Sequence, residues 1–500
     1  MDVAELLRKL KLGSSVAEHD DALERYFIET DTFRALVSGE KDIIAGDKGT
    51  GKTAIYKILQ TRYTTLSELS QVEVVAAFNP AGNPVFQRLA EGDPLEEGQY
   101  ITVWKAYFLA LAGNWVLALN EGAFSHKMTE LDRLLSSTGL RSTDDTPNTV
   151  FSRIVNLFRR ISDPKAVEAA ITLGPNGIPI LTPRIELGEG EPSGELVEHD
   201  YALGVLNDVI RETGVSVWLV LDRLDEAFQG FPRAEVPALR ALLRTYLDLL
   251  ELDHLRLKLF LRKDLFRRVI AGPAGGFVNL THVNARKIEI IWDEEDLFEL
   301  LARRISDNAD FLEELGLQEA TSQEIFDTVS PRQVDQGDRK PTTWAWMISR
   351  IRDGNGIAPP RNLIDLVTKA HAAELRRQAR ESREVAVGEP LISSDSIKRG
   401  LQALSQERVE DTLLAEAGDY ASTIERFRGG KAEHNEESLA TLLEVAVGEV
   451  RTVVTPLVEL GFLEKAGESY KVPMLYREGL SITQGKAFAS DGQDETADES

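Results

Sequence analysis

Apolar residues follow two different spacings along this chain, and together these spacings predict a mixed α/β protein. Nearly continuous apolar runs are typical of strands buried on both faces, as in a parallel sheet. Such runs occupy residues 43–45, 72–78, 215–221, 255–261 and 287–292. Between and after them, apolar residues at helical spacing predict helices within residues 1–40, 101–170 and 293–385.

A long segment separates the second and third apolar runs, and we interpret it as an insertion at about 81–200. Residues 81–100 are rich in Gly, Pro and acids and predict a loop. Two short β-like runs, 171–173 and 178–181, are joined by residues 174–177, which predicts a hairpin. Residues 187–200 are acidic and Gly-rich, as expected of a surface loop.

The first apolar run leads directly into the pattern G-x-x-x-x-G-K-T, and a helical pattern follows it. Glycines let such a loop curl so that its N–H groups face phosphate oxygens, and the helix adds its positive N-terminal end. Lys52 can reach the β- and γ-phosphates, and the Thr53 hydroxyl can bind Mg²⁺. The alternative is a glycine-rich turn before an ordinary helix. The predicted nucleotide-binding residues are Gly46, Asp47, Lys48, Gly49, Thr50, Gly51, Lys52, Thr53 and Ala54.

Three carboxylates begin where the third apolar run ends, which is where ligands sit in open α/β sheets. We expect Asp222 to hold Mg²⁺ through water, and Asp225 or Glu226 to polarise the attacking water. The alternative is a buried strand followed by an acidic turn.

Two arginines lie at positions that suit contact with a phosphate. Arg262 ends the fourth run, beside the place of the γ-phosphate in P-loop ATPases of the additional-strand type, or it forms a surface salt bridge. Pro360 can begin a helix, which places Arg361 in the first turn, facing a phosphate across an interdomain cleft. Alternatively, Arg361 is solvated or pairs with Asp365.

Composition narrows the classes of protein. The 500 residues predict two to four domains. The chain has no cysteine, which excludes disulfides, thiolate zinc sites and cysteine nucleophiles. No apolar run approaches the length of a membrane span, and the charged N-terminus does not resemble a signal peptide. We therefore expect a cytoplasmic protein without membrane contact.

The C-terminal part has the pattern of a winged helix. Residues 439–449 and 451–460 predict two helices, and residues 461–464 and 470–473 predict wing strands around a turn at 466–469. The chain has a formal charge of −25, which disfavours broad DNA binding. The winged helix is therefore predicted to bind a protein partner or DNA.

These motifs resemble those of bacterial ATPases in the AAA+/STAND branch of P-loop proteins. Residues 46–53 match the Walker A motif, and residues 219–226 are similar to the Walker B motif of NACHT-type members. Arg223 stands where those members usually have a small residue. Arg286 resembles the arginine finger of AAA+ proteins such as origin-recognition ATPases, and residues 356–366 resemble their sensor-2 segment, with Arg361 as the sensor.

The resemblance implies a parallel α/β sheet of order 5-1-4-3-2, a helical insertion, a helical lid and a C-terminal winged helix. It also implies ATP over GTP as the nucleotide, and self-association on activation through Arg286. We expect slow Mg·ATP hydrolysis in a switch that acts in regulation or phage defence. The alternatives are a nucleotide-gated DNA-binding regulator and an ATP-dependent scaffold. The expected divisions are 1–39 (helical lead-in), 40–292 (ATPase domain), 293–390 (lid), 391–486 (winged helix) and 487–500 (disordered acidic tail).

Overall fold

The computed structural model describes residues 2–78, 95–142, 154, 171–173, 179–181, 199–227, 232–270, 277, 279–386 and 388–488. The chain forms two compact units. We call Glu29–Ile291 the sheet unit, and Met1–Ile28 with Trp292–Ser500 the helical unit. Most of the predicted loops at 81–100 and 187–200, and the predicted tail from residue 489 onward, lie outside the described residues.

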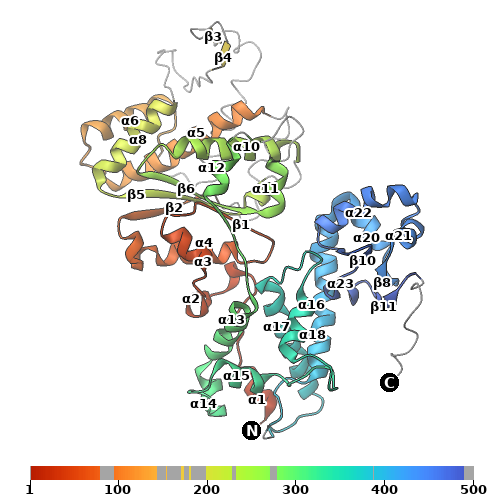
Figure 1. The fold of residues 1–500 in the computed structure, drawn as a ribbon. Coiled ribbons are helices and arrows are strands. Elements are labelled where there is room, and N and C mark those ends of the chain that lie inside the picture. Colours follow the sequence, from red (N-terminus) through yellow and green to blue (C-terminus); the bar gives the residue numbers. More distant parts are fainter. Residues whose placement is uncertain are drawn as a thin grey trace. The chain divides into compact units, whose positions relative to one another are not determined.

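A five-stranded parallel sheet forms the centre of the sheet unit (Figure 1). Its strands lie in the order β2-β5-β6-β1-β7. Numbered as core strands along the chain, this is 2-3-4-1-5, so the predicted order 5-1-4-3-2 is confirmed. The strands are β1 (Ile43–Gly46), β2 (Val72–Phe78), β5 (Ser216–Leu221), β6 (Leu255–Arg262) and β7 (Lys287–Glu289).

The last strand is shorter than the predicted 287–292. It ends at Glu289 because its partner β1 ends at Gly46, where the chain leaves the sheet. The Ile290 N–H still donates to the Ala45 carbonyl at 2.8 Å, but Ile291 is 75% exposed.

Helices cover both faces of the sheet (Figure 1). On one face lie α3 (Asp31–Val37) and α4 (Lys52–Arg62), and on the other lie α5 (Glu97–Leu119), α8 (His199–Thr213) and α10 (Pro232–Leu249). The shorter helices are α6 (His126–Ser137), α9 (Leu224–Ala227), α11 (Lys263–Ile270) and α12 (Leu280–Ala285). The predicted hairpin is confirmed as β3 (Ile171–Leu173) paired antiparallel with β4 (Pro179–Leu181).

Among the described helices, α5 alone has the length and hydropathy of a membrane span, but 72% of its most apolar 18 residues are buried. Its Trp104 is fully buried, stacks on Phe108 and donates a 2.9 Å hydrogen bond to the Ala238 carbonyl in α10. Core packing against α8 and α10 therefore accounts for its apolar composition.

The helical unit combines the first residues of the chain with the predicted lid. Asp293 caps α13 by accepting from the Asp296 N–H at 2.7 Å, and Pro360 is the first residue of α17, both as predicted. Gly400 lets α17 and α18 cross closely, because a Cβ there would lie 2.7 Å from the Ala370 nitrogen. The helices are α1 (Val3–Lys9), α2 (Leu23–Tyr26), α13 (Glu294–Ser306), α14 (Ala309–Leu315), α15 (Ser322–Val329), α16 (Thr343–Ile351), α17 (Pro360–Gln378) and α18 (Ser394–Glu407).

The winged helix is present, with boundaries that differ from the prediction. Its first helix, α21, ends at Leu443 and not at residue 449, because Glu444 adopts a left-handed conformation (φ 57°) that stops the helix. The wing strands are β9 and β10, later than predicted for the first, because Phe462 and Leu463 enter the core instead of the wing. The elements are β8 (Lys431–His434), α21 (Glu436–Leu443), α22 (Val450–Glu459), β9 (Glu464–Ala466), β10 (Ser469–Lys471), α23 (Met474–Arg477) and β11 (Thr483–Lys486).

Candidate functional site

The candidate site lies at the carboxyl edge of the parallel sheet. Three adjacent strands, β1, β5 and β6, each end there in polar or charged residues. The register places Gly46 of β1 beside Arg262 of β6, and Asp222 follows the last residue of β5. The topology therefore brings the glycine-rich loop, the carboxylates that follow β5 and Arg262 to one edge, where ligands bind in open α/β sheets.

The glycine-rich loop turns sharply between β1 and α4. Gly49 and Gly51 have φ values of 80° and 100°, which L side chains rarely adopt. The Thr50 hydroxyl donates to the Asp47 carbonyl at 2.8 Å and closes the loop on itself. Gly51 is the N-cap of α4, so the free N–H groups of the first helical turn face the loop. This is the geometry of an anion site.

Lys52 lies folded over this loop. Its ammonium donates to the carbonyls of Gly46 and Asp47 at 2.8 and 2.9 Å. Burial lowers the pKa of Lys52, while the charges of Asp225 and Asp222 oppose that shift. The cation is therefore held at the mouth of the loop by weak carbonyl acceptors, which a phosphate oxygen can replace with a charge-assisted bond.

Asp222 is the most deeply buried carboxylate of the site, at 1% exposed. Burial raises its pKa to about 6, although the hydrogen bond from the Thr53 side chain and the charge of Lys52 act in the other direction. Its Oδ2 atom is buried and has no hydrogen-bond partner among the described residues. A free carboxylate oxygen next to a threonine hydroxyl fits a divalent cation bound by oxygen ligands, such as Mg²⁺.

Each of the two remaining Walker B carboxylates faces an arginine. Asp225 lies 3.6 Å from Arg262, and Glu226 lies 3.5 Å from Arg223. Arg223 has a φ of 56°, a left-handed conformation that costs a non-glycine residue about 1–2 kcal/mol. A glycine would adopt this conformation without that cost.

One cation of the site was missed by sequence reasoning. Lys263, the first residue after β6, lies 3.5 Å from Asp47 in the loop and 3.0 Å from Glu289 of β7. Lys263 could have been found in the same way as Arg262, because both residues stand at the carboxyl end of the same predicted strand. Arg262 itself also forms a two-point ion pair with Asp264, at 3.0 and 3.1 Å.

The structure does not bring Arg286 to the loop of its own chain. Its Nε lies 3.2 Å from Asp42, and its Nη1 donates to the carbonyls of Gly39 and Glu40. These residues precede β1, at the end of that strand opposite the loop. An arginine at this position can act on the nucleotide of a neighbouring subunit or pair with a carboxylate of its own chain, and the ion pair with Asp42 is of the second kind. A role toward a neighbouring subunit stays a prediction.

Arg361 belongs to the helical unit, where it is the second residue of α17. Asp365, which was named above as an alternative partner of Arg361, accepts a hydrogen bond from Arg408. A role for Arg361 at a phosphate stays a prediction.

No protein-family model and no curated protein matches the chain. Two similar solved structures are those of the Aeropyrum pernix ORC1 protein in complex with DNA and the Aeropyrum pernix ORC2 protein in ADPNP-ADP complexes. The first is 11% identical, with a TM-score of 0.36 over 94% of this chain and 96% of that chain. The second is 14% identical, with a TM-score of 0.34 over 93% and 92%. At such TM-scores the neighbours assign no activity or ligand to this chain.

Proposed function

We propose that this chain binds Mg·ATP at the carboxyl edge of its sheet and hydrolyses it. The observation that carries the proposal is the position of Lys52, which is bonded to the carbonyls of Gly46 and Asp47 and lies near the buried Asp222 and its hydrogen-bond partner Thr53. A cation, the free N–H groups at the start of α4 and a carboxylate oxygen without a partner among the described residues meet there, which matches a triphosphate with its metal ion.

In this proposal the loop from Gly46 to Gly51 surrounds the phosphates, and Lys52 exchanges its carbonyl partners for phosphate oxygens. Thr53 and Asp222 hold Mg²⁺, which when bound neutralises charge on the phosphates. Thr53 contributes its hydroxyl, and Asp222 contributes its free Oδ2, directly or through water.

Asp225 is our candidate for the residue that orients the attacking water. Of the charges around Lys52, that of Asp225 has the largest influence on the lysine pKa, and Asp225 also lies beside Arg262. Glu226 pairs with Arg223 on the turn that follows Asp222. We assign Arg262 to the γ-phosphate, where it would leave Asp225 as the nucleotide enters.

Calorimetric titration with Mg·ATP tests the proposal. Lys52→Ala should lose measurable binding, because it removes the only charge that the P-loop motif itself aims at the phosphates. Lys57→Ala removes a lysine from the same helix and is the matched control, with an affinity close to that of wild type. Equal affinity of wild type and folded Lys52→Ala would refute the assignment, and GTP in place of ATP would show which base is preferred.

The coupling of hydrolysis to motion is a further part of the proposal. By resemblance, Arg361 would report the nucleotide to the lid, and Arg286 would act on the nucleotide of a neighbouring subunit. Arg286 would first have to leave Asp42 and the Gly39 and Glu40 carbonyls. A switch role in regulation or phage defence rests on the resemblance alone.

DNA binding through the winged helix is the second candidate function, and the charges there disfavour it. Residues 391–486 contain 11 basic and 16 acidic residues. Arg451, the one basic residue of α22, lies 2.6 Å from Glu436, and Lys471 in the wing lies 3.8 Å from Glu433. A salt titration of binding to duplex DNA decides, because phosphate contacts produce a steep loss of affinity with salt.

A further inference from the structure

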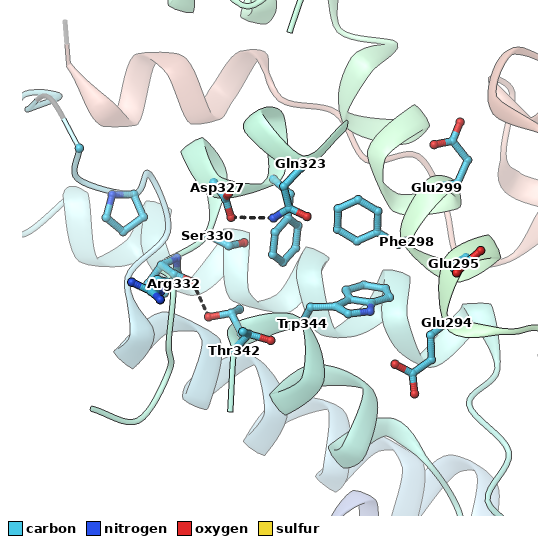
Figure 2. Close-up of a pocket in the computed structure, with 15 residues that line it drawn as sticks. Glu294, Glu295, Phe298, Glu299, Gln323, Asp327, Ser330, Arg332, Thr342 and Trp344 are labelled. Carbon is cyan, nitrogen blue, oxygen red and sulfur yellow. Dashed lines mark hydrogen bonds between the residues drawn. The ribbon is translucent and has the colours of Figure 1, made fainter. Parts of the chain in front are cut away.

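The helical unit contains a cavity that the proposed ATPase function does not use (Figure 2). Its volume is about 1040 Å³. It lies between α13 and α15, and the start of α16 and two connecting segments complete its wall. A cavity of this size exceeds a single side chain and has room for a short stretch of peptide.

Three aromatic rings form one surface of this cavity. Phe298, Phe326 and Trp344 pack in a mutual cluster, with ring centroids 5.4, 5.1 and 6.0 Å apart. Two of the three contacts are edge-to-face. Phe298 and Trp344 remain partly exposed, so an occupant can contact them. Aromatic faces attract both alkyl chains and cations.

The cavity is also acidic on one side. Figure 2 shows Glu294, Glu295 and Glu299 beside the rings, all from α13. Glu294 is paired with Arg352 and Glu299 with Arg303, each at 2.7 Å. Glu295 is exposed and forms no ion pair or hydrogen bond with any residue that the structure describes. It is therefore available to a cation from outside.

The opposite side offers hydrogen-bonding groups. Ser330 is 4% exposed and lines the cavity, yet its hydroxyl makes no hydrogen bond to the described residues. Arg332 lies on the same side of the rings as Ser330 (Figure 2). The Ser330 hydroxyl can therefore form a hydrogen bond with a ligand or a water molecule in the cavity.

We propose that this cavity binds a short basic segment of a partner protein. An arginine or lysine of that segment would place its charged end at Glu295 and its alkyl stem against Phe298 and Trp344. Ser330 and Arg332 would bond the carbonyl oxygens of the peptide backbone. The charge of −25 on the whole chain favours the approach of a basic partner.

Two other occupants fit less well. Phosphates of a nucleic acid would meet the carboxylates of α13. A polyamine would leave Ser330 without an acceptor for its hydroxyl proton and would place a cation near Arg332. A peptide satisfies both sides, because it carries cations and carbonyl oxygens together.

Fluorescence anisotropy with a labelled hexapeptide, Gly-Leu-Arg-Leu-Arg-Gly, tests the proposal on the full chain. Glu295→Lys should weaken binding at least tenfold. Glu313→Lys, an exposed carboxylate on α14 that does not line the cavity, makes the same charge change and should bind like wild type. Trp344→Leu keeps an apolar side chain but removes the ring, and should weaken binding severalfold. Thermal melts would verify that each variant is folded.

The same peptide with citrulline in place of arginine should bind at least tenfold more weakly, since citrulline keeps the shape and loses the charge. Equal effects of Glu295→Lys and Glu313→Lys would show general attraction to an acidic chain and would overturn the site. Equal binding of the citrulline peptide, or no binding of the arginine peptide up to millimolar concentration, would also overturn it. Spermidine binding as tightly as the peptide would replace the proposed occupant by a polyamine.

Discussion

Buried charged residues lie at both ends of strand β1, but those at the amino end are paired more completely than those at the carboxyl end. At its amino end, Asp42 and Lys258 are both 1% exposed and lie 2.7 Å apart. Asp42 also accepts from the Tyr246 hydroxyl at 3.0 Å and faces Arg286 at 3.2 Å. Lys258 in addition lies 3.8 Å from the centre of the Trp218 ring. This network, which we call the Asp42 cluster, satisfies its charges within the chain.

At its carboxyl end, β1 leads into a site whose charges are less completely satisfied. Lys52 is bonded to carbonyl oxygens, and Asp222 has a buried oxygen without a partner among the described residues. Asp225 and Arg262 lie 3.6 Å apart, beyond the length of a good hydrogen bond. Both ends use buried carboxylates and cations, so charge alone does not mark the functional end.

The difference indicates how to separate structure from function in such a sheet. A saturated cluster stabilises the fold, because removing one partner leaves another charge buried and alone. A cluster whose charged atoms are not all paired lowers the stability of the fold, and the unpaired atoms remain able to bind a ligand. Substitutions at the two ends should therefore act on different properties.

The largest effect on stability is expected at the Asp42 cluster. Asp42→Asn should lower the free energy of unfolding by about 3–5 kcal/mol, because Lys258 and Arg286 lose their shared carboxylate in a buried setting. A denaturant titration measures the loss. Asp31→Asn breaks an exposed pair with Arg34 and should cost less than about 1 kcal/mol. A loss below about 1 kcal/mol at Asp42 would mean that the cluster is not a structural support.

The next effect concerns turnover. Asp225→Asn should reduce the steady-state rate of ATP hydrolysis by about 10²–10³ while binding and stability stay close to wild type, as for other positioned catalytic groups. Phosphate release under saturating Mg·ATP measures it. Glu226→Gln is the companion variant and should be mild. If Glu226→Gln instead loses most of its hydrolysis rate while Asp225→Asn loses little, Glu226 is the residue that orients the attacking water.

A smaller effect, on the pH dependence of stability, should appear at Asp222 in the metal-free protein. Its pKa is raised from 3.8 to about 6, so the folded state holds the proton more tightly than the unfolded state. The contribution of Asp222 to the free energy of unfolding of the wild type is then greatest below pH 4, and it falls by up to about 3 kcal/mol as the pH rises through 6. Asp222→Asn lacks this fall and should be the more stable protein at pH 7.5 without metal. The two proteins should converge near pH 4, and a wild type more stable than the variant at pH 7.5 would contradict the assignment.

The smallest effect is expected at Arg286, which is 33% exposed on its side chain. Arg286→Ala should cost about 1–2 kcal/mol, because Lys258 still neutralises Asp42. If Arg286 also acts between subunits, activity per subunit should rise with protein concentration, and mixing Arg286→Ala with Lys52→Ala should restore part of it. Flat activity without rescue would leave Arg286 with the structural role alone.

The sheet and the loop were predictable because their signals are local. The glycines, Lys52 and Thr53 stand next to each other in the sequence, and the apolar run before Asp222 predicts a strand buried on both faces. The strand order came from the resemblance, since local patterns do not determine pairing. The ion pair of Lys258 with Asp42 could not be predicted. Lys258 interrupts an apolar run, and nothing in the sequence indicates that Asp42 lies beside it.

Features built from distant segments could not be predicted either. The cavity joins Glu295, Ser330 and Trp344 from separate helices and a connection, and none of these residues stands in a motif. The helix end at Leu443 depends on a left-handed Glu444, a residue type that gives no warning of that conformation. The strand β7 ends early because its partner turns away, which no pattern within β7 reports.

We propose that Mg·ATP binds at the carboxyl end of β1 and not at its amino end. The most direct test is the gain in unfolding free energy when Mg·ATP is added to wild type, Asp42→Asn and Asp222→Asn. Asp42→Asn should be less stable than wild type without ligand yet gain as much from Mg·ATP, about 2.7 kcal/mol at a hundredfold excess over Kd. Asp222→Asn should begin at least as stable as wild type and gain no more from Mg·ATP than from ATP with a chelator. A full gain in Asp222→Asn together with no gain in folded Asp42→Asn would show that the carboxyl end of β1 is not the Mg·ATP site.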